Sequence, residues 1–531
     1  MGRPLWRRRL YLSHLLAATL ACAAACNVGT TRYIETTAVN GAVDANMPLS
    51  LDGNQAQQQN ITFVTSEHIP RLSPCTSGAP APRALRRLTQ KEVNATLSDL
   101  FGNDAAVPQS TNLFNGDPMQ YGFDNVQSVL LVANNAGIVI LTLSEEVAAY
   151  AAANMAKVTN CTDATDPCRQ SFIQGFGSKV FRRPLTGDQV EVYRALMASQ
   201  SSFAVGLQAV VSAMLQSPYF LYRSELGVAG SDGTFTLTPY EIASELSYLI
   251  LGSMPDTTLM QAAADGNLKT AAQIKAQATR LLQSPRAHIT TQNFMSQWLG
   301  IALLPNNSRQ EGSAVLDQNT KLDMVQEAKL LADDIVFAKN GTFADLWAAD
   351  HTFANANLSH FYGLSGPSGT DFVSLPLAGS GRQPGMLGLG GFISAASQAN
   401  YGSPTLRGRT VRMRLLCDTL GSPPAGVPPL GDLAGNATLR QRFTSHTTVA
   451  SCAYCHKLMD PLGYPFGLYN TIGLPVPGGL DNGQPIDTSG AVNDANGGPS
   501  VPLRDLADLS AYFVQDTDAA ACMARHWTMY A

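Results

Sequence analysis

The clearest chemistry in this chain lies in five consecutive residues, Cys452-Ala453-Tyr454-Cys455-His456. Cys-x-x-Cys-His is the attachment signature of c-type haem, in which both thiols bond covalently to the haem and the His ligates its iron. With 9 Cys and 8 His in 531 residues, chance would produce this pattern roughly 0.002 times. The sequence therefore predicts one covalent haem, with His456 as the proximal ligand.

Two other chemistries could use the same side chains. His446, Cys452, Cys455 and His456 are the ligand types of a structural zinc site, although adjacent Cys455 and His456 fit poorly round one tetrahedral ion. A Cys452–Cys455 disulfide is the third option, because an exported protein meets an oxidising compartment. Of the three, the residue pattern favours haem.

The group that occupies the second axial position of the predicted haem decides whether the haem transfers electrons or reacts with small molecules. A Met or His there closes the iron for electron transfer, whereas an open position permits chemistry on small molecules. Met459 follows His456 by three residues on the same helix face, so we expect it to pack rather than to ligate. The candidates for the second ligand are His446, Met523, His526 and Met529.

A basic amphipathic segment precedes the motif and contains Arg407, Arg409, Arg412 and Arg414. Arg407 and Arg409 could pair with the haem propionates through charge-assisted hydrogen bonds; the alternative is a solvated helix face. The carboxylates near the motif lie beside Pro or Gly, which predicts turns; they are Asp460, Asp481 and Asp487. Neither Gly-x-Ser-x-Gly nor His-Glu-x-x-His occurs, so hydrolase and metalloprotease functions lack support.

The first residues have the pattern of an export signal. Arginines at positions 3 and 7–9 precede a short apolar stretch at 10–25, and Ala23-Ala24-Ala25-Cys26 resembles a bacterial lipobox. We expect cleavage and lipidation at Cys26, which would place the protein in the periplasm or at the cell surface as an outer-membrane lipoprotein. An ordinary secretory peptide is the alternative. Covalent haem attachment in bacteria also takes place outside the cytoplasm.

Composition narrows the possible partners. Net charge is −5, and no block of Lys or Arg suggests binding to nucleic acid. After the signal, no stretch of eighteen uninterrupted apolar residues occurs, so we predict membrane contact by the lipid alone. A disulfide between Cys161 and Cys168 would close a turn-rich hexapeptide, and Cys417–Cys522 is a plausible second pair that leaves Cys75 unpaired.

Apolar periodicity predicts a mainly α, multidomain body. Three helix starts are predicted from their N-terminal residues: Thr89 with Glu92, Thr186 alone, and Thr238 with Pro239 after it. Further helices are predicted at 136–157, 269–283, 286–299, 320–339 and 355–362, and one strand at 371–375. The glycines at 385–391 lack phosphate-loop spacing and indicate close packing or a bend.

The predicted divisions of the chain follow from these elements and from composition. They are the signal and lipobox (1–26), a flexible linker (27–82), helical domains (83–160, 161–226 and 227–366), a Gly/Arg/Pro-rich segment (367–435) and a small, loop-rich, haem-c-like module (436–531).

Several segments together resemble a family of multidomain secreted proteins of planctomycetes and myxobacteria. These proteins consist of consecutive domains of unknown function and are often associated with planctomycete-type cytochrome c. The matching segments are 86–89, 97–102, 181–186, 217–223, 241–256, 403–408, His446 and 452–463. The resemblance implies a helical body with a haem-c-like end module, and it implies no reaction.

This chain departs from the family pattern at two places. Gly467 and Asn470 stand where the family usually has Glu and Asp, and the sequence ends at Tyr530-Ala531 where the family continues into another helical segment. We therefore expect a poorly packed terminal helix and the loss of a possible haem ligand.

Taken together, these features predict an exported monohaem cytochrome-like protein that exchanges electrons with a periplasmic or surface redox protein, or serves as the electron-transfer arm of an oxidoreductase. One alternative is a non-catalytic surface scaffold in which the Cys-x-x-Cys-His motif forms a disulfide or zinc clasp. Another is a haem enzyme with an open sixth position, acting on an oxidant or a polysaccharide-derived substrate.

Overall fold

The structure is a computed structural model that describes residues 84–114, 116–132, 136–160, 165–231, 234–420, 437–447, 450–494 and 498–531. The predicted export signal, the lipidation site Cys26, the linker at 27–82, Cys75 and Cys161 lie outside these residues. So does the part of the predicted Gly/Arg/Pro-rich segment at 421–435.

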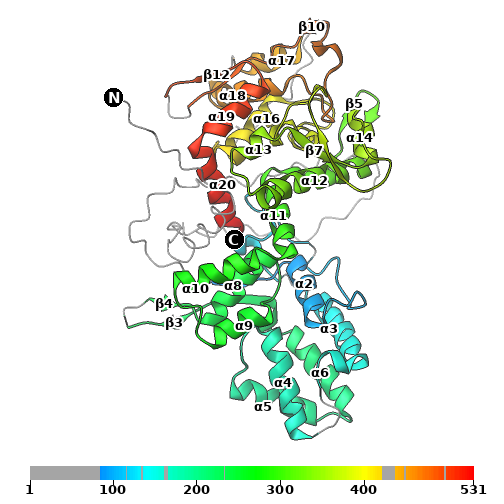
Figure 1. The fold of residues 1–531 in the computed structure, drawn as a ribbon, viewed down its shortest axis with the longest axis vertical. Helices are drawn as coiled ribbons and strands as arrows, with labels where there is room; N and C mark the ends of the chain where they lie inside the picture. Colours follow the sequence, from blue (N-terminus) through cyan, green and yellow to red (C-terminus); the bar gives the residue numbers. More distant parts are fainter. Residues whose placement is uncertain are drawn as a thin grey trace, which may run out of the picture.

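The protein is mainly α, as the sequence predicts, and Figure 1 shows its helices in two regions joined near the middle of the molecule. The first region contains α2 (Gln90–Leu100), α3 (Ala136–Ala153), α4 (Asp166–Val180), α5 (Gly187–Ala198), α6 (Phe203–Leu215) and α7 (Pro218–Leu221). Next along the chain come α8 (Pro239–Leu251), α9 (Thr257–Ala264), α10 (Ala271–Leu281), α11 (Pro285–Trp298), α12 (Gln318–Asp333), α13 (Asp345–Ala348), α14 (Ala356–Tyr362) and α15 (Gly390–Ala395). The last helices are α16 (Pro404–Thr410), α17 (Leu439–His446), α18 (Ala450–Gly463), α19 (Leu506–Gln515) and α20 (Thr517–Tyr530).

Short turns of other helix types connect these elements. The π-helices are η4 (Asp334–Ala338) and η6 (Val411–Leu415), and the 3-10 turns are η1 (Gln127–Val129), η2 (Met155–Lys157), η3 (Ile301–Asn306), η5 (Met386–Gly388), η7 (Tyr464–Phe466) and η8 (Pro477–Gly479). The helix predicted at 320–339 is therefore α12 continued by η4.

Side-chain caps begin three of the predicted helices. Thr89 accepts a hydrogen bond from the backbone N–H of Glu92, whose carboxylate accepts from the backbone N–H of Thr89. The same reciprocal capping box forms at Thr186 and at Thr238, where Pro239 occupies the first turn. Because these caps satisfy N–H groups that a helix start leaves unpaired, the sequence signals were reliable.

The strands of the described residues form two-stranded antiparallel ribbons. They are β1 (Ala84–Arg87) with β2 (Tyr222–Glu225), β3 (Val228–Ala229) with β4 (Phe235–Thr236), β5 (Gln310–Glu311) with β6 (Ala314–Val315), β7 (His351–Ala354) with β8 (Val373–Pro376), β9 (Leu480–Asp481) with β10 (Gln484–Pro485), and β11 (Gly490–Val492) with β12 (Val501–Leu503). The strand predicted at 371–375 is confirmed as β8. The β1–β2 ribbon was not predicted, because its two strands lie far apart in the sequence.

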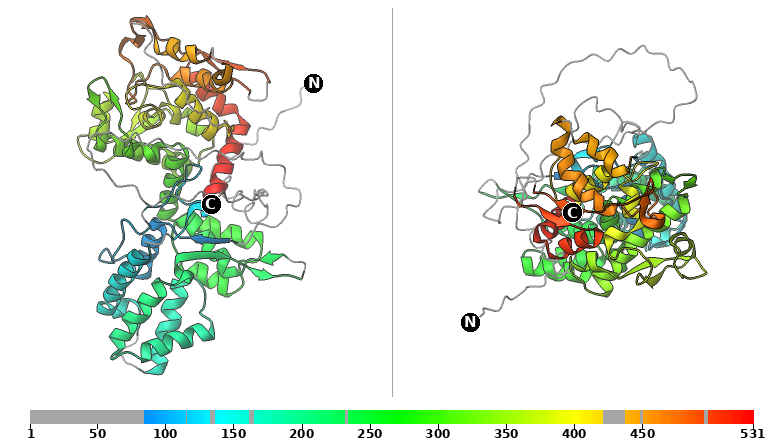
Figure 2. Two further views of the ribbon diagram at one scale, coloured as in Figure 1. Left: turned by 180° about the vertical axis from the view of Figure 1, so that it is seen from behind. Right: turned by 90° about the horizontal axis from the view of Figure 1, so that it is seen from above.

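Two large hydrophobic clusters form most of the core of the described residues. One cluster joins α2 to α7 and adds Tyr248 from α8, so the predicted domains at 83–160 and 161–226 share a single core. The other extends from α8 to α20 and includes Phe294, Trp298, Trp347 and Trp527. Helices α18, α19 and α20 all contribute to this second core, so the C-terminal segment packs with the rest of the body. Figure 2 shows this region from behind and from above.

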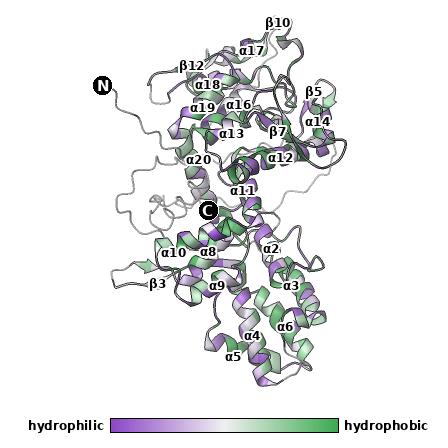
Figure 3. Cartoon of the chain, in the orientation of Figure 1, coloured by the Kyte–Doolittle hydropathy of each residue, from purple (hydrophilic) through white to green (hydrophobic). Residues whose placement is uncertain are grey.

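Helix α3 is long and apolar enough to cross a membrane by length and composition alone. It packs along α6, and its buried residues recur every three or four positions on one face, from Ala136 through Ile140, Leu143 and Val147 to Ala151. Figure 3 shows hydrophobic colour on both helices. This pattern is that of a core helix in the first hydrophobic cluster.

The glycine-rich run at 385–391 is a close-packed bend, as its spacing indicated. Gly385 has φ +79°, and a Cβ atom there would lie 2.2 Å from the carbonyl oxygen of Trp347. A Cβ atom at Gly388 would lie 1.8 Å from the carbonyl oxygen of Gln383. Only glycine permits this backbone approach.

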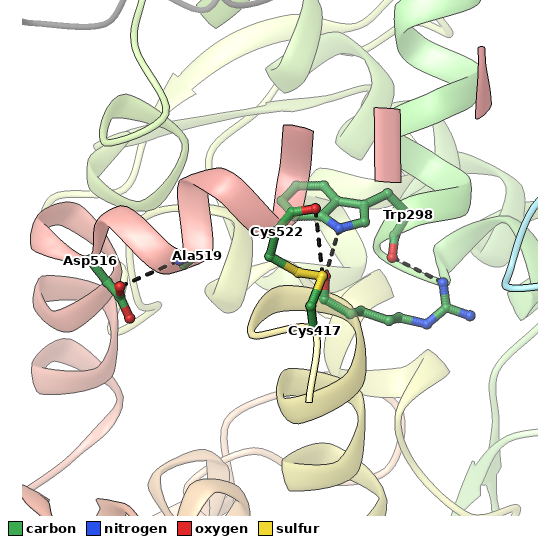
Figure 4. The surroundings of a disulfide bond; sticks show 6 residues. Trp298, Cys417, Asp516, Ala519 and Cys522 are labelled. Carbon is green, nitrogen blue, oxygen red and sulfur yellow. Dashed lines mark hydrogen bonds between the residues drawn. A yellow bond between two sulfur atoms is a disulfide. The ribbon is translucent and has the colours of Figure 1, made fainter. Parts of the chain in front are cut away.

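The terminal helix α20 is tightly packed, so the expectation of poor packing is wrong. Trp527 and Tyr530 belong to the central core, and Arg86 of β1 donates hydrogen bonds to the backbone carbonyls of Tyr530 and Ala531. The Cys417–Cys522 disulfide, predicted from the sequence, ties α20 to the end of η6 with a Cα–Cα distance of 5.5 Å (Figure 4). Burial of these aromatic rings packs α20 against the central core.

Cys417→Ala combined with Cys522→Ala should lower the free energy of unfolding by about 2–5 kcal/mol, because this disulfide closes a long loop. The two cysteines are 105 residues apart. Urea unfolding of the double variant and of the oxidised wild type measures the difference. Equal midpoints with equal slopes would show that the bridge adds nothing to stability.

Candidate functional site

The Cys-x-x-Cys-His motif lies in helix α18. Cys452, Cys455 and His456 stand at positions i, i+3 and i+4, so they share one face of that helix. Both cysteines are half-buried, and neither forms a disulfide. Tyr454, on another face, is 59% exposed. The helix therefore presents two thiols and an imidazole side by side, and the disulfide clasp is not formed.

His456 is held by a buried carboxylate one turn further along the same helix. Its Nδ1 lies 2.9 Å from Oδ2 of Asp460, and the two side chains are 17% and 1% exposed. The other carboxylate oxygen, Oδ1, accepts a hydrogen bond of 2.6 Å from the hydroxyl of Thr405 in α16. Since a carboxylate accepts, Nδ1 donates to Asp460, and Nε2 is the ring nitrogen that a metal would bind.

Asp460 was predicted to serve in a turn because Pro461 follows it, and that expectation is wrong. Helix α18 continues through Pro461 to Gly463, and Asp460 points into the protein. The spacing of four residues from His456 was the available signal, because residues four apart meet on one helix face.

Helices α16 and α18 cross with their backbones in contact. A Cβ atom at Gly408 would lie 1.7 Å from the carbonyl oxygen of Met459, and one at Gly463 would lie 1.8 Å from that of Pro404. Both glycines belong to segments on which the family resemblance rests. Their lack of a side chain lets α16 approach closely enough for Thr405 to reach Asp460.

A small apolar cluster adjoins the motif. Leu420, Leu458 and Met459 are buried together, and both Met413 of η6 and Cys455 pack against them. The expected packing role of Met459 is confirmed. Met413 was not considered from the sequence, because it precedes the motif by many residues and only the tertiary fold brings it to the same cluster.

Arg407 is buried and bound to the backbone, so its predicted role in holding haem propionates is wrong. Its guanidinium donates to the carbonyl oxygens of Phe466 at 2.8 Å, Tyr469 at 3.0 Å and Asn470 at 2.9 Å, and to the hydroxyl of Ser397. Burial lowers the pKa of Arg407 to about 10. A guanidinium committed to three carbonyls offers no exposed edge to a propionate.

The neighbouring arginines are also not a solvated face. Arg412 donates to the carbonyl oxygen of Leu458 at 3.0 Å and pairs with Asp418 at 2.7 Å. Arg414 donates to the carbonyl oxygens of Gln297 and Trp298 at the end of α11, and burial lowers its pKa to about 10. Burial also lowers the pKa of Arg409, which is half-buried; its pairing with a propionate stays a prediction.

The predicted second ligands fall in different places. Met523 is buried in the central core and Met529 packs against it, whereas Cys455 packs with the small cluster. His526 is also buried, and burial with the positive charge of Arg414 lowers its pKa to about 3. His446 ends α17, and its side chain lies outside the described part of the structure. The described contacts therefore bring none of these side chains to the motif.

Among the described residues, the metal-ligand atoms that gather within 4.8 Å of one another are those of Cys417, Cys522 and His526. Both sulfurs of this group are joined in the disulfide, so only the His nitrogens remain as ligand atoms. The motif residues do not form such a group in the described part of the chain. The zinc alternative also needs His446, whose side chain lies outside that part. Cys168 is disulfide-bonded, and the predicted partner Cys161 lies outside the described residues.

Four consecutive segments match models of protein families. Residues 86–153 match PSD3, protein of unknown function (DUF1587), and 168–225 match PSD5, protein of unknown function (DUF1595). Residues 237–364 match PSD4, protein of unknown function (DUF1592), and 383–475 match PSCyt3, protein of unknown function (DUF1588). Comparison with curated proteins and with solved structures finds no match.

These matches confirm the predicted series of consecutive domains of unknown function. The name PSCyt3 refers to planctomycete cytochrome c, and that match spans the Cys-x-x-Cys-His motif. It also crosses position 435, where the sequence placed a boundary. The contact between α16 and α18 agrees with a single unit across that position.

Gly408→Ala should lower the free energy of unfolding by about 1–3 kcal/mol, because the new methyl group meets the backbone of α18. Gly175→Ala in α4 is the matched control, since a Cβ atom there has nothing within 4 Å. Gly175→Ala should leave the free energy of unfolding unchanged or raise it by up to about 1 kcal/mol. Urea unfolding of both variants tests the pair, and equal effects would contradict a backbone contact at Gly408.

Proposed function

We propose that this protein is an exported c-type cytochrome that carries one covalent haem on helix α18 and transfers single electrons to or from another redox protein. The observation that carries the proposal is the donor set on one helix face. Two thiols outside any disulfide lie beside a histidine whose Nδ1 is held by Asp460. This is the arrangement expected of an iron-ligating imidazole, with the second ring nitrogen oriented by its partner.

The residues present fit a covalent haem by the chemistry of their donors. Cys452 and Cys455 would form the thioether bonds, and His456 would ligate the iron through Nε2. Leu420, Leu458 and Met459 offer an apolar surface next to Cys455. A haem held there supplies reversible one-electron exchange. The residues of this chain bind the group, orient the imidazole and exclude water on the side of the apolar cluster.

Two further lines support the same proposal. The PSCyt3 match, with its reference to cytochrome c, covers the motif. The basic and then apolar N-terminal sequence predicts export to the compartment where bacteria attach c-type haem. We accordingly propose a periplasmic or cell-surface location with a lipid anchor at Cys26, and a redox protein of the same compartment as the partner.

The contacts of Met413 favour an electron-transfer protein over a haem enzyme with an open sixth position. Met413 and Cys455 pack against the same three buried side chains, so this thioether lies in the cluster next to the attachment site. The methionines proposed from the sequence pack in the central core instead. We infer that Met413 is the first residue to test as a further iron ligand, and a thioether bound to the iron would close it to small molecules.

Haem content tests the main proposal. Protein expressed with c-type maturation machinery should carry about one covalent haem per chain, measured by a pyridine haemochrome spectrum and by haem staining of a denaturing gel. Cys452→Ala with Cys455→Ala should abolish covalent haem. His456→Ala should abolish the low-spin spectrum, because the iron loses its proximal ligand. Wild-type protein without haem would contradict the proposed cytochrome function and would favour the alternative, a non-catalytic helical surface scaffold.

Carbon monoxide binding tests the role of Met413. The reduced wild-type protein should bind carbon monoxide weakly if the sixth position is closed, and Met413→Ala should bind it at least tenfold more tightly because that position opens. Met523→Ala is the matched control, since its side chain lies in the central core. Tight binding by the wild type would instead support a haem enzyme with an open sixth position.

A further inference from the structure

We propose that Asp460 tunes the haem by withdrawing the Nδ1 proton of His456 toward a buried carboxylate, which lowers the reduction potential of the iron. Asp460 is thus a positioning and tuning residue that acts through His456. The inference rests on the proposed haem attachment, and it adds a property that the Cys-x-x-Cys-His motif alone does not specify.

The geometry makes the contact between the two side chains strong and directional. The distance from Nδ1 to Oδ2 is 2.9 Å, and Asp460 is 1% exposed. Water therefore competes little for this carboxylate, and a hydrogen bond to a charged acceptor in a site of low dielectric constant is strengthened. The shared helix face sets the spacing, since His456 and Asp460 are four residues apart.

A second helix fixes the orientation of the carboxylate. Thr405 of α16 donates its hydroxyl hydrogen to Oδ1 at 2.6 Å, which leaves Oδ2 directed at the imidazole. The backbone contact of α16 with α18 at Gly408 and Gly463 holds Thr405 in place. The carboxylate cannot turn away from His456 without losing this hydrogen bond.

The carboxylate of Asp460 pairs with the imidazole of His456. Within the described residues, the ion pair formed by Asp460 is the one with His456. Two arginines of the segments that pack against α18 are bound elsewhere: Arg407 of α16 to carbonyl oxygens and Arg412 of η6 to Leu458 and Asp418. The negative charge of Asp460 therefore lies next to Nδ1 of His456, where it polarises the N–H bond.

The electronic consequence follows from the ligand chemistry. A carboxylate that accepts the Nδ1 proton raises the basicity of the other ring nitrogen. A more basic Nε2 stabilises ferric iron relative to ferrous iron, so the one-electron reduction of the iron becomes less favourable. The protein is therefore suited to donate its electron rather than to act as a strong oxidant.

Asp460→Asn tests this in the matured, haem-containing protein, because the amide keeps the shape and an acceptor oxygen but removes the charge. Potentiometric titration should show a higher reduction potential. At the wild-type midpoint, the ferrous to ferric ratio should rise at least tenfold, which corresponds to about 59 mV for one electron. An unchanged potential in a variant with one haem per chain would overturn the inference and leave the proposed haem attachment intact.

Thr405→Val is the second variant. Without the Thr405 hydroxyl the carboxylate is free to turn away from His456, so the potential should rise above that of the wild type. Thr405→Ser keeps the hydroxyl and is the matched control, and its potential should stay at the wild-type value. If Asp460→Asn yields no haem-containing protein, Thr405→Val decides, and a potential that does not rise overturns the inference. A wild type without haem would instead overturn the proposed function.

Discussion

Buried arginine side chains bound to backbone carbonyls hold this fold together. Arg407 binds three carbonyls after α18, Arg182 binds those of Tyr219, Phe220 and Tyr222, and Arg86 binds those at the end of α20. A chain with 45 Gly and 30 Pro has many irregular turns whose carbonyls no helix or sheet satisfies. Unsatisfied buried carbonyls are costly, and a planar guanidinium with five donors can satisfy several together.

The candidate site depends on this network. Arg407 fastens α16 to the turn that follows α18, and Gly408 and Gly463 let the two helices touch. That contact puts Thr405 against Asp460, and Asp460 in turn holds His456. The chemistry proposed for the motif is therefore a property of two crossed helices. The pentapeptide supplies the ligands, and the crossing supplies their orientation.

Elements that depend on nearby residues were predictable from the sequence. The helix starts at Thr89, Thr186 and Thr238 formed as expected, and the capping box at each needs only a partner three residues away. The mainly α class follows from apolar periodicity in the same way. Arg407 was misjudged because a basic, amphipathic pattern suggests an exposed charge, whereas its partners are carbonyls some sixty residues away. Composition cannot show such pairing.

The sequence by itself determined the Cys-x-x-Cys-His motif and the helical class, and it made Cys417–Cys522 a plausible pair that the structure confirms. Only the tertiary structure decided that Asp460 faces His456 and that α20 fills the central core. The reason is physical: thiol and imidazole chemistry and helix starts reside in contiguous residues, whereas burial and crossing geometry arise when distant segments exclude water together. The role of Asp460 beside His456 depends on this burial and crossing geometry, so only the tertiary structure could reveal it.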